Sequence, residues 1–155
     1  MEIKRLPLAA LGISGAGLVM LAVLEGFSPT AYKDIVGVPT IGFGETKGVL
    51  MGHRTTPERS LVHLLSRIED EYGRGLKKCI KVPLYQHEYD AYLALSYNIG
   101  VRAFCNSTVV KRLNEEKYEE ACTAIKLFNR AGGKKVQGLV NAREKGYKRC
   151  IGQNA

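Results

Sequence analysis

A long uncharged segment near the N-terminus places the strongest constraint on how this chain can fold. Leu6 to Leu24 form nineteen consecutive residues without a formal charge, preceded by Lys4 and Arg5 and followed by Glu25. A single helix of this length would span about 28 Å, which is close to the roughly 30 Å hydrocarbon core of a bilayer. Glycine, serine and alanine residues dilute the leucines, however, so the free energy of insertion into a membrane should be marginal.

Three interpretations of this segment compete. It could be a signal peptide that is cleaved near Ser14-Gly15-Ala16. It could be a permanent membrane anchor, which its small residues disfavour, or a weak, uncleaved anchor that later leaves the membrane and folds into the protein as a helix. The basic pair before the segment would keep the N-terminus in the cytoplasm. We favour the weak anchor, because small side chains lose little free energy on exposure to water.

The remaining sequence predicts a small β lobe followed by a helical lobe. Residues 31–44 are rich in β-branched and aromatic residues with glycines between them, which is typical of a short hairpin. Thr55-Thr56-Pro57-Glu58 predicts a helix start with a capping threonine. A glycine-bearing turn, Gly73 to Gly75, is expected to close that helix. Apolar spacing predicts further helices at residues 85–100, 109–113, 118–128 and 139–151.

The predicted fold class is therefore α+β, mostly α. The chain divides into a helical N-terminal segment at residues 1–24 and one domain at residues 25–155. Within that domain, the β lobe is expected at about residues 25–54 and the helical lobe at about residues 55–155.

The net charge of +8 is unevenly distributed. Between Lys126 and Cys150, eight basic residues accompany a single acidic residue, Glu144. Such a surface attracts anions, for example nucleic acid, phospholipid headgroups or an anionic cell wall, although an ordinary solvated helix face explains it equally well. No helix-turn-helix, zinc-finger or RNA-recognition motif supports nucleic-acid binding, and the three histidines fit no metal motif. We therefore expect no nucleic-acid partner, no metal and no cofactor.

The four cysteines, Cys79, Cys105, Cys122 and Cys150, include no C-x-x-C pair, so neither a zinc site nor a thioredoxin-like motif is predicted. An even number of cysteines behind an export-like segment favours disulfides. Two bridges allow three pairings, between which the sequence does not choose. Buried free thiols in a cytoplasmic protein are the alternative.

Glu25, Asp34 and Thr40 are the candidate catalytic residues. Hydrolysis of a glycosidic bond needs one carboxyl group that stays protonated and donates to the leaving oxygen, and a second group that readies water or attacks directly. Glu25 follows an apolar run that could desolvate it and raise its pKa, whereas Asp34 lies on the more exposed hairpin and would stay ionised. The hydroxyl of Thr40 could help Asp34 to hold the attacking water. The spacing alone is weak evidence, because such a triplet also arises by chance.

The sequence around these residues closely resembles the active-site region of phage endolysins of glycoside hydrolase family 24. The run EGFSPTAYKDIVGVPTIGFGET from Glu25 to Thr46 keeps that family's Glu-x8-Asp-x5-Thr pattern. Helical-lobe motifs follow in the family's order at residues 94–100 (ALSYNIG), 103–108 (AFCNST), 131–134 (AGGK) and 138–144 (GLVNARE). The resemblance covers about residues 18–150.

This resemblance implies a lysozyme-like fold, in which a cleft between the two lobes binds the polymer of N-acetylmuramic acid and N-acetylglucosamine. It implies a muramidase that hydrolyses the β-1,4 bond of peptidoglycan by a single, inverting displacement and so lyses the host cell. Glu25 would be the acid, and Asp34 and Thr40 would position water. The implied substrate contacts are Gly42, Phe43, Gly44, Asn98, Phe104 and Asn141. The distance between the carboxyl groups decides the stereochemistry, because a separation of about 6.5–9.5 Å supports inversion and one of about 5–5.5 Å favours a covalent intermediate.

The sequence departs from the family at two positions. Glu45 stands where many relatives carry a histidine, and we expect this change to affect stability rather than catalysis. Ala142 stands where many relatives carry an additional arginine before Arg143, so part of the family's C-terminal ion pairing is expected to be absent.

The apolar start is similar to that of signal-anchor-release endolysins. This subtype implies export by the host's Sec machinery, an inactive form tethered to the host inner membrane, and an active periplasmic form, expected to be a monomer, that acts on peptidoglycan after release. With Leu24 in the bilayer, the helix that carries Glu25 could not pack against the lobe that carries Thr40.

Two other classes of function compete with an enzyme: a non-enzymatic membrane or wall-binding protein, and a nucleic-acid-binding protein. A binding protein, unlike an enzyme, should keep its effect after Glu25→Gln.

Overall fold

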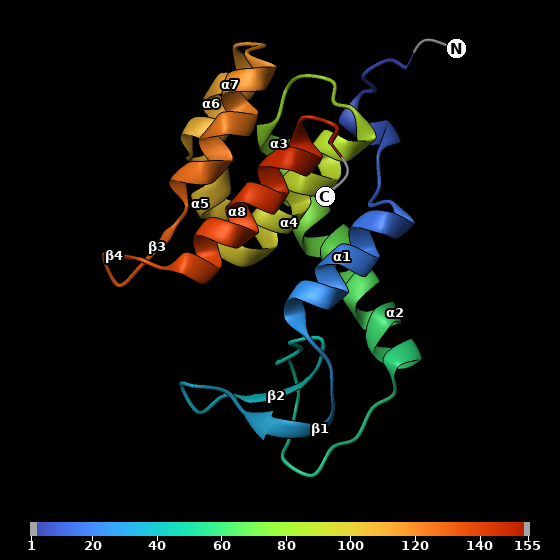
Figure 1. Cartoon of the computed structure of the whole chain (residues 1–155). Helices are drawn as coiled ribbons and strands as arrows, with labels where there is room; N and C mark the ends of the chain where they lie inside the picture. Colours follow the sequence, from blue (N-terminus) through green and yellow to red (C-terminus); the bar gives the residue numbers. More distant parts are fainter. Residues whose placement is uncertain (1–2, 154–155) are drawn as a thin grey trace.

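The computed structural model describes residues 3–153, so the outermost positions of the two predicted segments, 1–2 and 154–155, lie outside the described residues. A small β lobe lies at one end of the molecule and a larger helical lobe at the other (Figure 1). Two helices, α1 (Gly15–Glu25) and α2 (Pro57–Arg67), run from the helical lobe to the β lobe. The predicted α+β, mostly helical fold class is confirmed.

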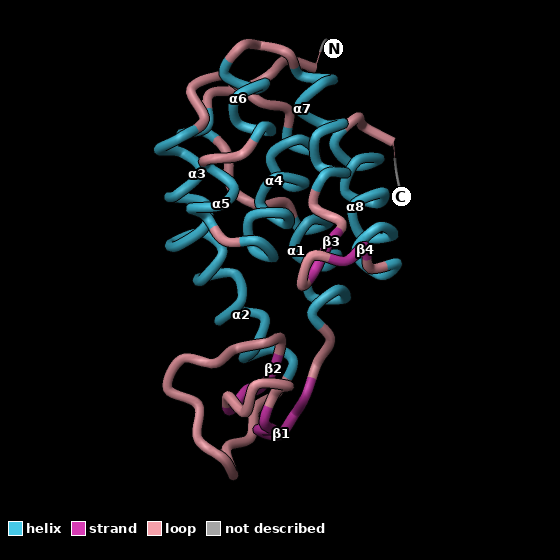
Figure 2. The backbone as a smooth tube through the Cα atoms, turned by 90° about the vertical axis from the view of Figure 1, so that its left-hand side faces the viewer, coloured by secondary structure: helices cyan, strands magenta, loops and turns pink. Residues whose placement is uncertain are grey.

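The β lobe is built on one antiparallel hairpin, β1 (Ser28–Lys33) and β2 (Pro39–Gly42). Tyr32 pairs with Thr40 and Lys33 with Pro39, and a tight turn at residues 34–38 connects the strands. A long loop then leads back to α2 (Figure 2). The hairpin predicted for residues 31–44 is confirmed, although its first strand starts three residues earlier.

The helix that starts at Pro57 is longer than predicted. Thr56 caps it, since its hydroxyl accepts a hydrogen bond from the Arg59 amide. The helix then continues through a π-helical turn (Ile68–Gly73) into α3 (Arg74–Cys79). The prediction that Gly73 to Gly75 closes it is wrong, because these glycines serve close packing instead of termination. A Cβ at Gly75, for example, would lie 2.4 Å from a side-chain carbon of Val101.

The rest of the helical lobe surrounds α4. Its further elements are α4 (Gln86–Ile99), α5 (Val101–Cys105), α6 (Thr108–Asn114), α7 (Tyr118–Ala124), a three-ten turn (Ile125–Leu127), the short hairpin β3 (Arg130–Ala131) and β4 (Lys134–Lys135), and α8 (Gln137–Cys150). Tyr89, Tyr92 and Leu93 of α4 are completely buried, and α4 contacts α1, α5 and α8. The four predicted helices of this lobe are confirmed, whereas α5 and the β3–β4 hairpin were not predicted.

Two disulfides close the helical lobe. Cys79–Cys105 joins α3 to α5, and Cys122–Cys150 joins α7 to α8. This result confirms disulfides over free thiols and selects one of the three pairings that the sequence left open.

The uncharged N-terminal segment does not form one continuous helix here. A three-ten turn (Leu8–Ala10) is followed by extended residues 11–14, and α1 begins only after Ser14, whose hydroxyl accepts from the Gly17 amide at 3.0 Å. Leu8, Leu11 and Leu21 are buried in the core of the helical lobe. Within residues 3–153, no helix has the length and apolar character needed to cross a membrane.

Candidate active site

Glu25 is the last residue of α1 and lies where the two lobes meet. Gly26, with φ +71°, ends the helix and turns the chain into β1. The Glu25 side chain is about half-buried, and this burial raises the pKa of its carboxyl group, although the positive charge of Arg67 opposes the rise. A carboxyl group with a raised pKa keeps its proton closer to neutral pH, which is what a general acid needs.

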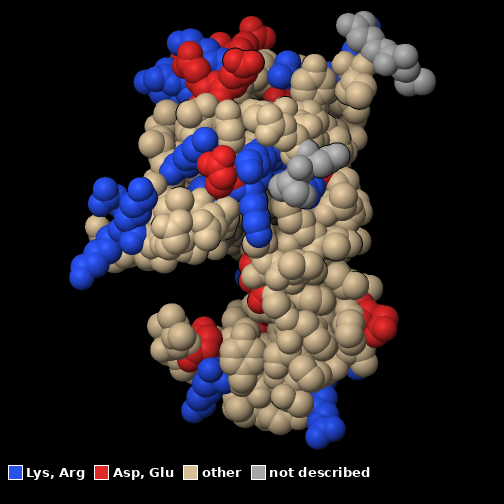
Figure 3. All heavy atoms as spheres, viewed as in Figure 1, with Lys and Arg blue, Asp and Glu red and all other residues tan. Residues whose placement is uncertain are grey.

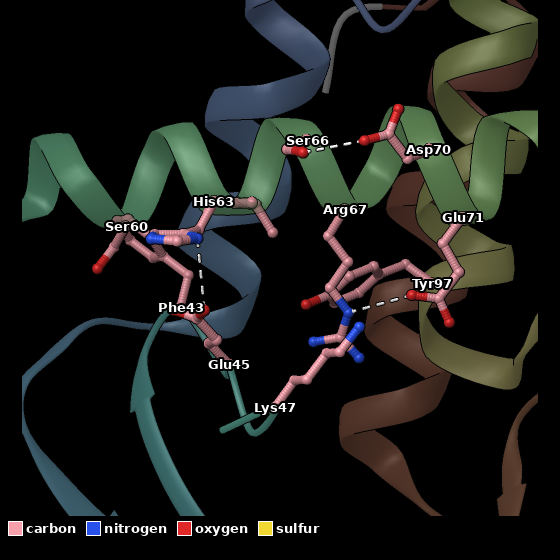
Figure 4. Close-up of a pocket in the computed structure, with 11 residues that line it drawn as sticks. Phe43, Glu45, Lys47, Ser60, His63, Ser66, Arg67, Asp70, Glu71 and Tyr97 are labelled. Carbon is pink, nitrogen blue, oxygen red and sulfur yellow. Dashed lines mark hydrogen bonds and ion pairs between the residues drawn. The ribbon is translucent and has the colours of Figure 1, made fainter. Parts of the chain in front are cut away.

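Arg67 and Tyr97 form the helical-lobe side of the Glu25 environment. Arg67 ends α2, and its guanidinium lies 5.5 Å from the centre of the Tyr97 ring of α4. Burial, and then the nearby Glu25 carboxylate, raise the pKa of Tyr97 to about 12. Figure 4 shows both side chains at a hollow of about 670 Å³ between α2 and the β-lobe loop that carries Phe43 and Lys47. Sequence analysis did not identify Arg67, and it placed Tyr97 only within the predicted helix at residues 85–100 and the motif at residues 94–100.

Asp34 is held at the first position of the hairpin turn. The amide N–H groups of Val36 and Val38 donate to its Oδ1 at 2.9 and 2.8 Å. No donor within residues 3–153 takes its second oxygen, Oδ2. The turn therefore fixes the carboxylate in orientation and leaves one oxygen free to accept a proton from water.

Thr40 lies on β2 and is 4% exposed. Its hydroxyl donates to the carbonyl oxygen of Val38 at 2.9 Å. With its proton engaged in this way, the hydroxyl oxygen can still accept a hydrogen bond through its lone pairs. Thr40 is thus oriented as an acceptor, the role that holding the hydrogen of a water molecule would require.

The predicted contacts on the β-lobe loop lie beside Glu25 and α2. A Cβ at Gly44 would stand 2.9 Å from Glu25 Oε2. Phe43 packs on Phe27, with ring centres 5.2 Å apart, and also lines the hollow of Figure 4. Gly42 is buried, and a Cβ there would come within 2.5 Å of a serine hydroxyl on α2, which makes it a packing position.

The predicted contacts on the helical lobe separate into two groups. Asn98 lines a groove of about 750 Å³ between α1, α4 and α8 that also contains Glu25, and Asn141 is exposed on α8. Phe104, by contrast, is completely buried against Tyr92. Its prediction as a substrate contact is corrected here, because its ring belongs to the core and is not accessible to a sugar.

The structure shows which side-chain contacts are made at Glu45 and next to Ala142, the two positions that depart from the family pattern. Glu45 pairs with His63, with Oε1 and Nδ1 3.5 Å apart, so an acid on the loop faces a histidine on α2. On α8, Arg143 donates to the carbonyl oxygen of Phe128 at 2.8 Å and to Asn98. Arg143 therefore ties α8 to the end of α4 through neutral acceptors.

The surface between the lobes is deeply hollowed, and Lys and Arg side chains gather on the helical lobe above the hollow (Figure 3). Part of this charge lies on β4 at Lys134 and Lys135. Within the described residues, no group of three His, Cys, Asp or Glu side chains could hold a metal ion. The described residues therefore offer a half-buried acid at the end of α1, a carboxylate that is fixed by the hairpin turn, and a buried hydroxyl on β2.

Comparison with known proteins gives consistent matches over most of the chain. The family model described as phage lysozyme matches residues 22–146. The SAR-endolysin of Pseudomonas phage phiKMV is 40% identical over 147 residues, covering 92% of this chain and 89% of that protein. The endolysin of Salmonella phage P22 is 38% identical over 128 residues, covering 77% and 85%. A crystal structure of a P22 lysozyme mutant matches with a TM-score of 0.84 at 34% identity, covering 91% of this chain and 99% of that one.

Proposed function

This chain belongs to the phage lysozyme family, and we propose that it is an endolysin that lyses the host cell by hydrolysing the β-1,4 bond between N-acetylmuramic acid and N-acetylglucosamine in peptidoglycan, with Glu25 as its general acid. The observation that carries the assignment of Glu25 is its position at the end of α1, half-buried where the lobes meet, with a pKa raised by that burial.

In the proposed reaction, the Glu25 carboxyl group donates its proton to the glycosidic oxygen as the bond from that oxygen to the anomeric carbon breaks. A water molecule attacks the anomeric carbon from the opposite face. Asp34 Oδ2 takes a proton from this water, and Thr40 Oγ1 accepts a hydrogen bond from it. A single displacement of this kind inverts the anomeric carbon and leaves Glu25 ionised and Asp34 protonated until they exchange protons with solvent.

This proposal can be tested by digesting purified peptidoglycan with the released protein and analysing the products. New reducing ends at N-acetylmuramic acid, with the α anomer formed first, are expected. Glu25→Gln and Asp34→Asn should each lower the rate by roughly 10²-fold or more, whereas Glu58→Gln, which alters an exposed carboxylate on α2, should not. Cleaved stem peptides on intact glycan strands, or an active Glu25→Gln variant, would contradict the assignment.

The N-terminal segment is proposed to control where and when this activity appears. The relationship to SAR-endolysins over most of the chain supports export through the host's Sec machinery, tethering of an inactive form at the inner membrane, and later release into the periplasm. The structure supplies a reason for inactivity, because α1 carries Glu25 and packs in the helical lobe. While the segment lies in the bilayer, Glu25 cannot occupy its place beside Gly44.

Fractionation of expressing cells before and after a protonophore collapses the membrane potential tests the release step. Full-length protein should move from the membrane to the soluble fraction, and lysis should follow. A soluble form whose sequence begins after Ser14 would instead indicate a cleaved signal peptide.

A further inference from the structure

Three acidic side chains of the helical lobe face the N-terminal segment and have no part in the proposed reaction. Glu88 and Asp90 lie in the first turns of α4 and are only 2% and 3% exposed, and Glu69 lies in the π-helical turn. Buried carboxylates require partners, because an unpaired charge loses its hydration. In this structure, a large share of those partners comes from residues 5–17.

Asp90 and Glu69 accept hydrogen bonds from the residues that directly precede α1. The Ser14 amide donates to Asp90 Oδ1 at 3.0 Å, and the Ser14 hydroxyl donates to Asp90 Oδ2. The Ile13 amide donates to Glu69 Oε1 at 2.6 Å. Gln86 adds a bond to the carbonyl oxygen of Gly12 at 2.8 Å. In a continuous helix, the backbone amide and carbonyl groups of residues 12–14 would bond to other backbone groups of the same helix. Here the side chains of Glu69, Asp90 and Gln86 bond to them instead.

Glu88 forms an ion pair with Arg5. The guanidinium donates from Nε and Nη2 to the two Glu88 oxygens at 3.0 and 3.1 Å. Its central carbon lies 3.5 Å from the ring centre of Tyr118 and 4.2 Å from that of Tyr85. A bidentate ion pair combined with aromatic contacts is a geometry that arginine, and not lysine, can form. The neighbouring residue, Leu6, exchanges two backbone hydrogen bonds with Leu84.

We propose that Glu69, Glu88 and Asp90 form a receptor for the released N-terminal segment, and that its occupation holds α1, and with it Glu25, in the active position. This inference rests on the release step of the proposed function. While the segment spans the membrane, a continuous helix satisfies its own amides and Arg5 stays on the cytoplasmic side. Release breaks the helix at residues 12–14, and the carboxylates then replace the lost hydrogen bonds.

Under this proposal, Arg5 has two successive roles. In the tethered form, its charge helps to orient the segment in the membrane. In the released form, the same charge is captured by Glu88, which favours the docked state over a return to the bilayer.

Two glycines in α1 provide a matched test of the Asp90 contact. Gly15→Ala and Gly17→Ala add the same methyl group to the segment and change its hydrophobicity and helix propensity alike. A Cβ at Gly17 would lie 2.7 Å from Asp90 Cγ, whereas a Cβ at Gly15 has no atom within 4 Å. Replacement of Gly12, Gly15 and Gly17 together by leucine should trap the protein in the membrane, but it combines greater hydrophobicity with this clash, so the alanine pair is the sharper test.

After a protonophore is added, wild type and Gly15→Ala should be recovered in the soluble fraction. Gly17→Ala should be released several-fold less. In its released fraction, the amides of α1 should exchange hydrogen at least about tenfold faster, because the docked state opens more readily. Equal release and equal exchange in the two variants would overturn the proposal.

Arg5 and Lys4 provide a second, independent pair. Lys4 is exposed and has no side-chain partner among the described residues. Lys4→Ala and Arg5→Ala therefore remove the same charge from the membrane flank. Only Arg5→Ala also removes the ion pair with Glu88. In the purified, released full-length protein, Arg5→Ala should accelerate exchange in α1 at least about tenfold, Arg5→Lys should restore part of the protection, and Lys4→Ala should leave it unchanged. Equal protection in Lys4→Ala and Arg5→Ala would refute the receptor.

These readouts separate the receptor from the enzymatic assignment. Wild-type protein that fails to cleave glycan strands would contradict the proposed function, yet the exchange comparison between variants would still report on docking. Conversely, full muramidase activity in a released Arg5→Ala variant with normal protection of α1 would contradict the receptor alone.

Discussion

Gly44 of the β lobe lies against the carboxyl group of Glu25, so closely that a Cβ on Gly44 would stand 2.9 Å from Glu25 Oε2. Gly44 also has φ +83°, a conformation that favours glycine. The backbone of the β lobe thus forms one wall around the proposed acid. Gly44, which was predicted as a substrate contact, lies directly beside the Glu25 carboxyl group in this structure.

Gly44→Ala is therefore expected to impair catalysis by displacing Glu25. Gly48→Ala is the matched control, because Gly48 has a similar φ of +70° but no atom within 4 Å of its would-be Cβ. Both variants should lose about 1 kcal/mol or more of stability from backbone strain. Only Gly44→Ala should also lose roughly 10²-fold in kcat/KM, the usual effect of a misplaced catalytic group. Equal kcat/KM values for the two folded variants would show that the contact is not important for catalysis.

Glu25→Gln should stabilise the fold while it removes activity. Burial raises the pKa of Glu25 above its unfolded value, so the folded state binds the proton more tightly, and stability is lost as pH rises through that range. Glutamine removes this penalty at pH 7. Because Glu25 is partly solvated, the gain should be less than about 1 kcal/mol, so Tm should rise by no more than roughly 2–4 °C. The gain should disappear at pH 4, where the carboxyl group is largely protonated in both states; a Tm increase that does not depend on pH would contradict the electrostatic origin.

Arg67 is expected to set the alkaline limit of activity. Its positive charge favours the ionised form of Glu25 and so lowers the pKa of this acid. Arg67→Met removes the charge but keeps an apolar stem near Tyr97, so Glu25 should stay protonated to higher pH. The alkaline limb of the kcat/KM profile should then move to higher pH, whereas Arg74→Met, which removes an exposed arginine from α3, should leave it in place. A shift to lower pH would mean that Arg67 does not act on Glu25 through its charge.

Local sequence signals predicted much of the fold, and they failed where packing overrides local preference. Capping at Thr56 and helical spacing in α4 are short-range features, so both were recognised. Gly73 and Gly75 have the same local signature as a turn, but neighbouring helices pack so closely on them that only glycine fits within a continuing helix. The break at residues 12–14 is equally non-local, because Asp90 and Glu69 stabilise it from distant parts of the chain.

The candidate site shows the same division. The spacing of Glu25, Asp34 and Thr40 is a feature of one contiguous stretch, so the family pattern is enough to propose these residues as catalytic candidates. Arg67 and Tyr97 reach Glu25 from α2 and α4, and no spacing in the sequence indicates this meeting. Phe104 lies within a family motif, but its burial in the core could be seen only in three dimensions.

The two disulfides should differ in their contribution to stability, although they close loops of almost equal length. Their sequence separations are 26 and 28 residues, so loop-closure entropy alone predicts a loss of about 3–4 kcal/mol for either bridge. Cys122–Cys150 has an additional neighbour, because the buried hydroxyl of Tyr92 lies 3.2 Å from Cys150 Sγ and 3.6 Å from Cys122 Sγ. Replacing these two cysteines by alanine leaves that hydroxyl without its acceptor, which costs about 1 kcal/mol more.

In urea unfolding, the variant lacking Cys122–Cys150 should therefore be less stable than the variant lacking Cys79–Cys105 by about 1 kcal/mol. Tyr92→Phe provides the control, because it removes the donor that would be left unpaired. In the Tyr92→Phe background, the two double-alanine variants should lose nearly equal stability. A difference that persists in this background would assign the inequality to packing around α7 and α8 instead of to the Tyr92 hydroxyl.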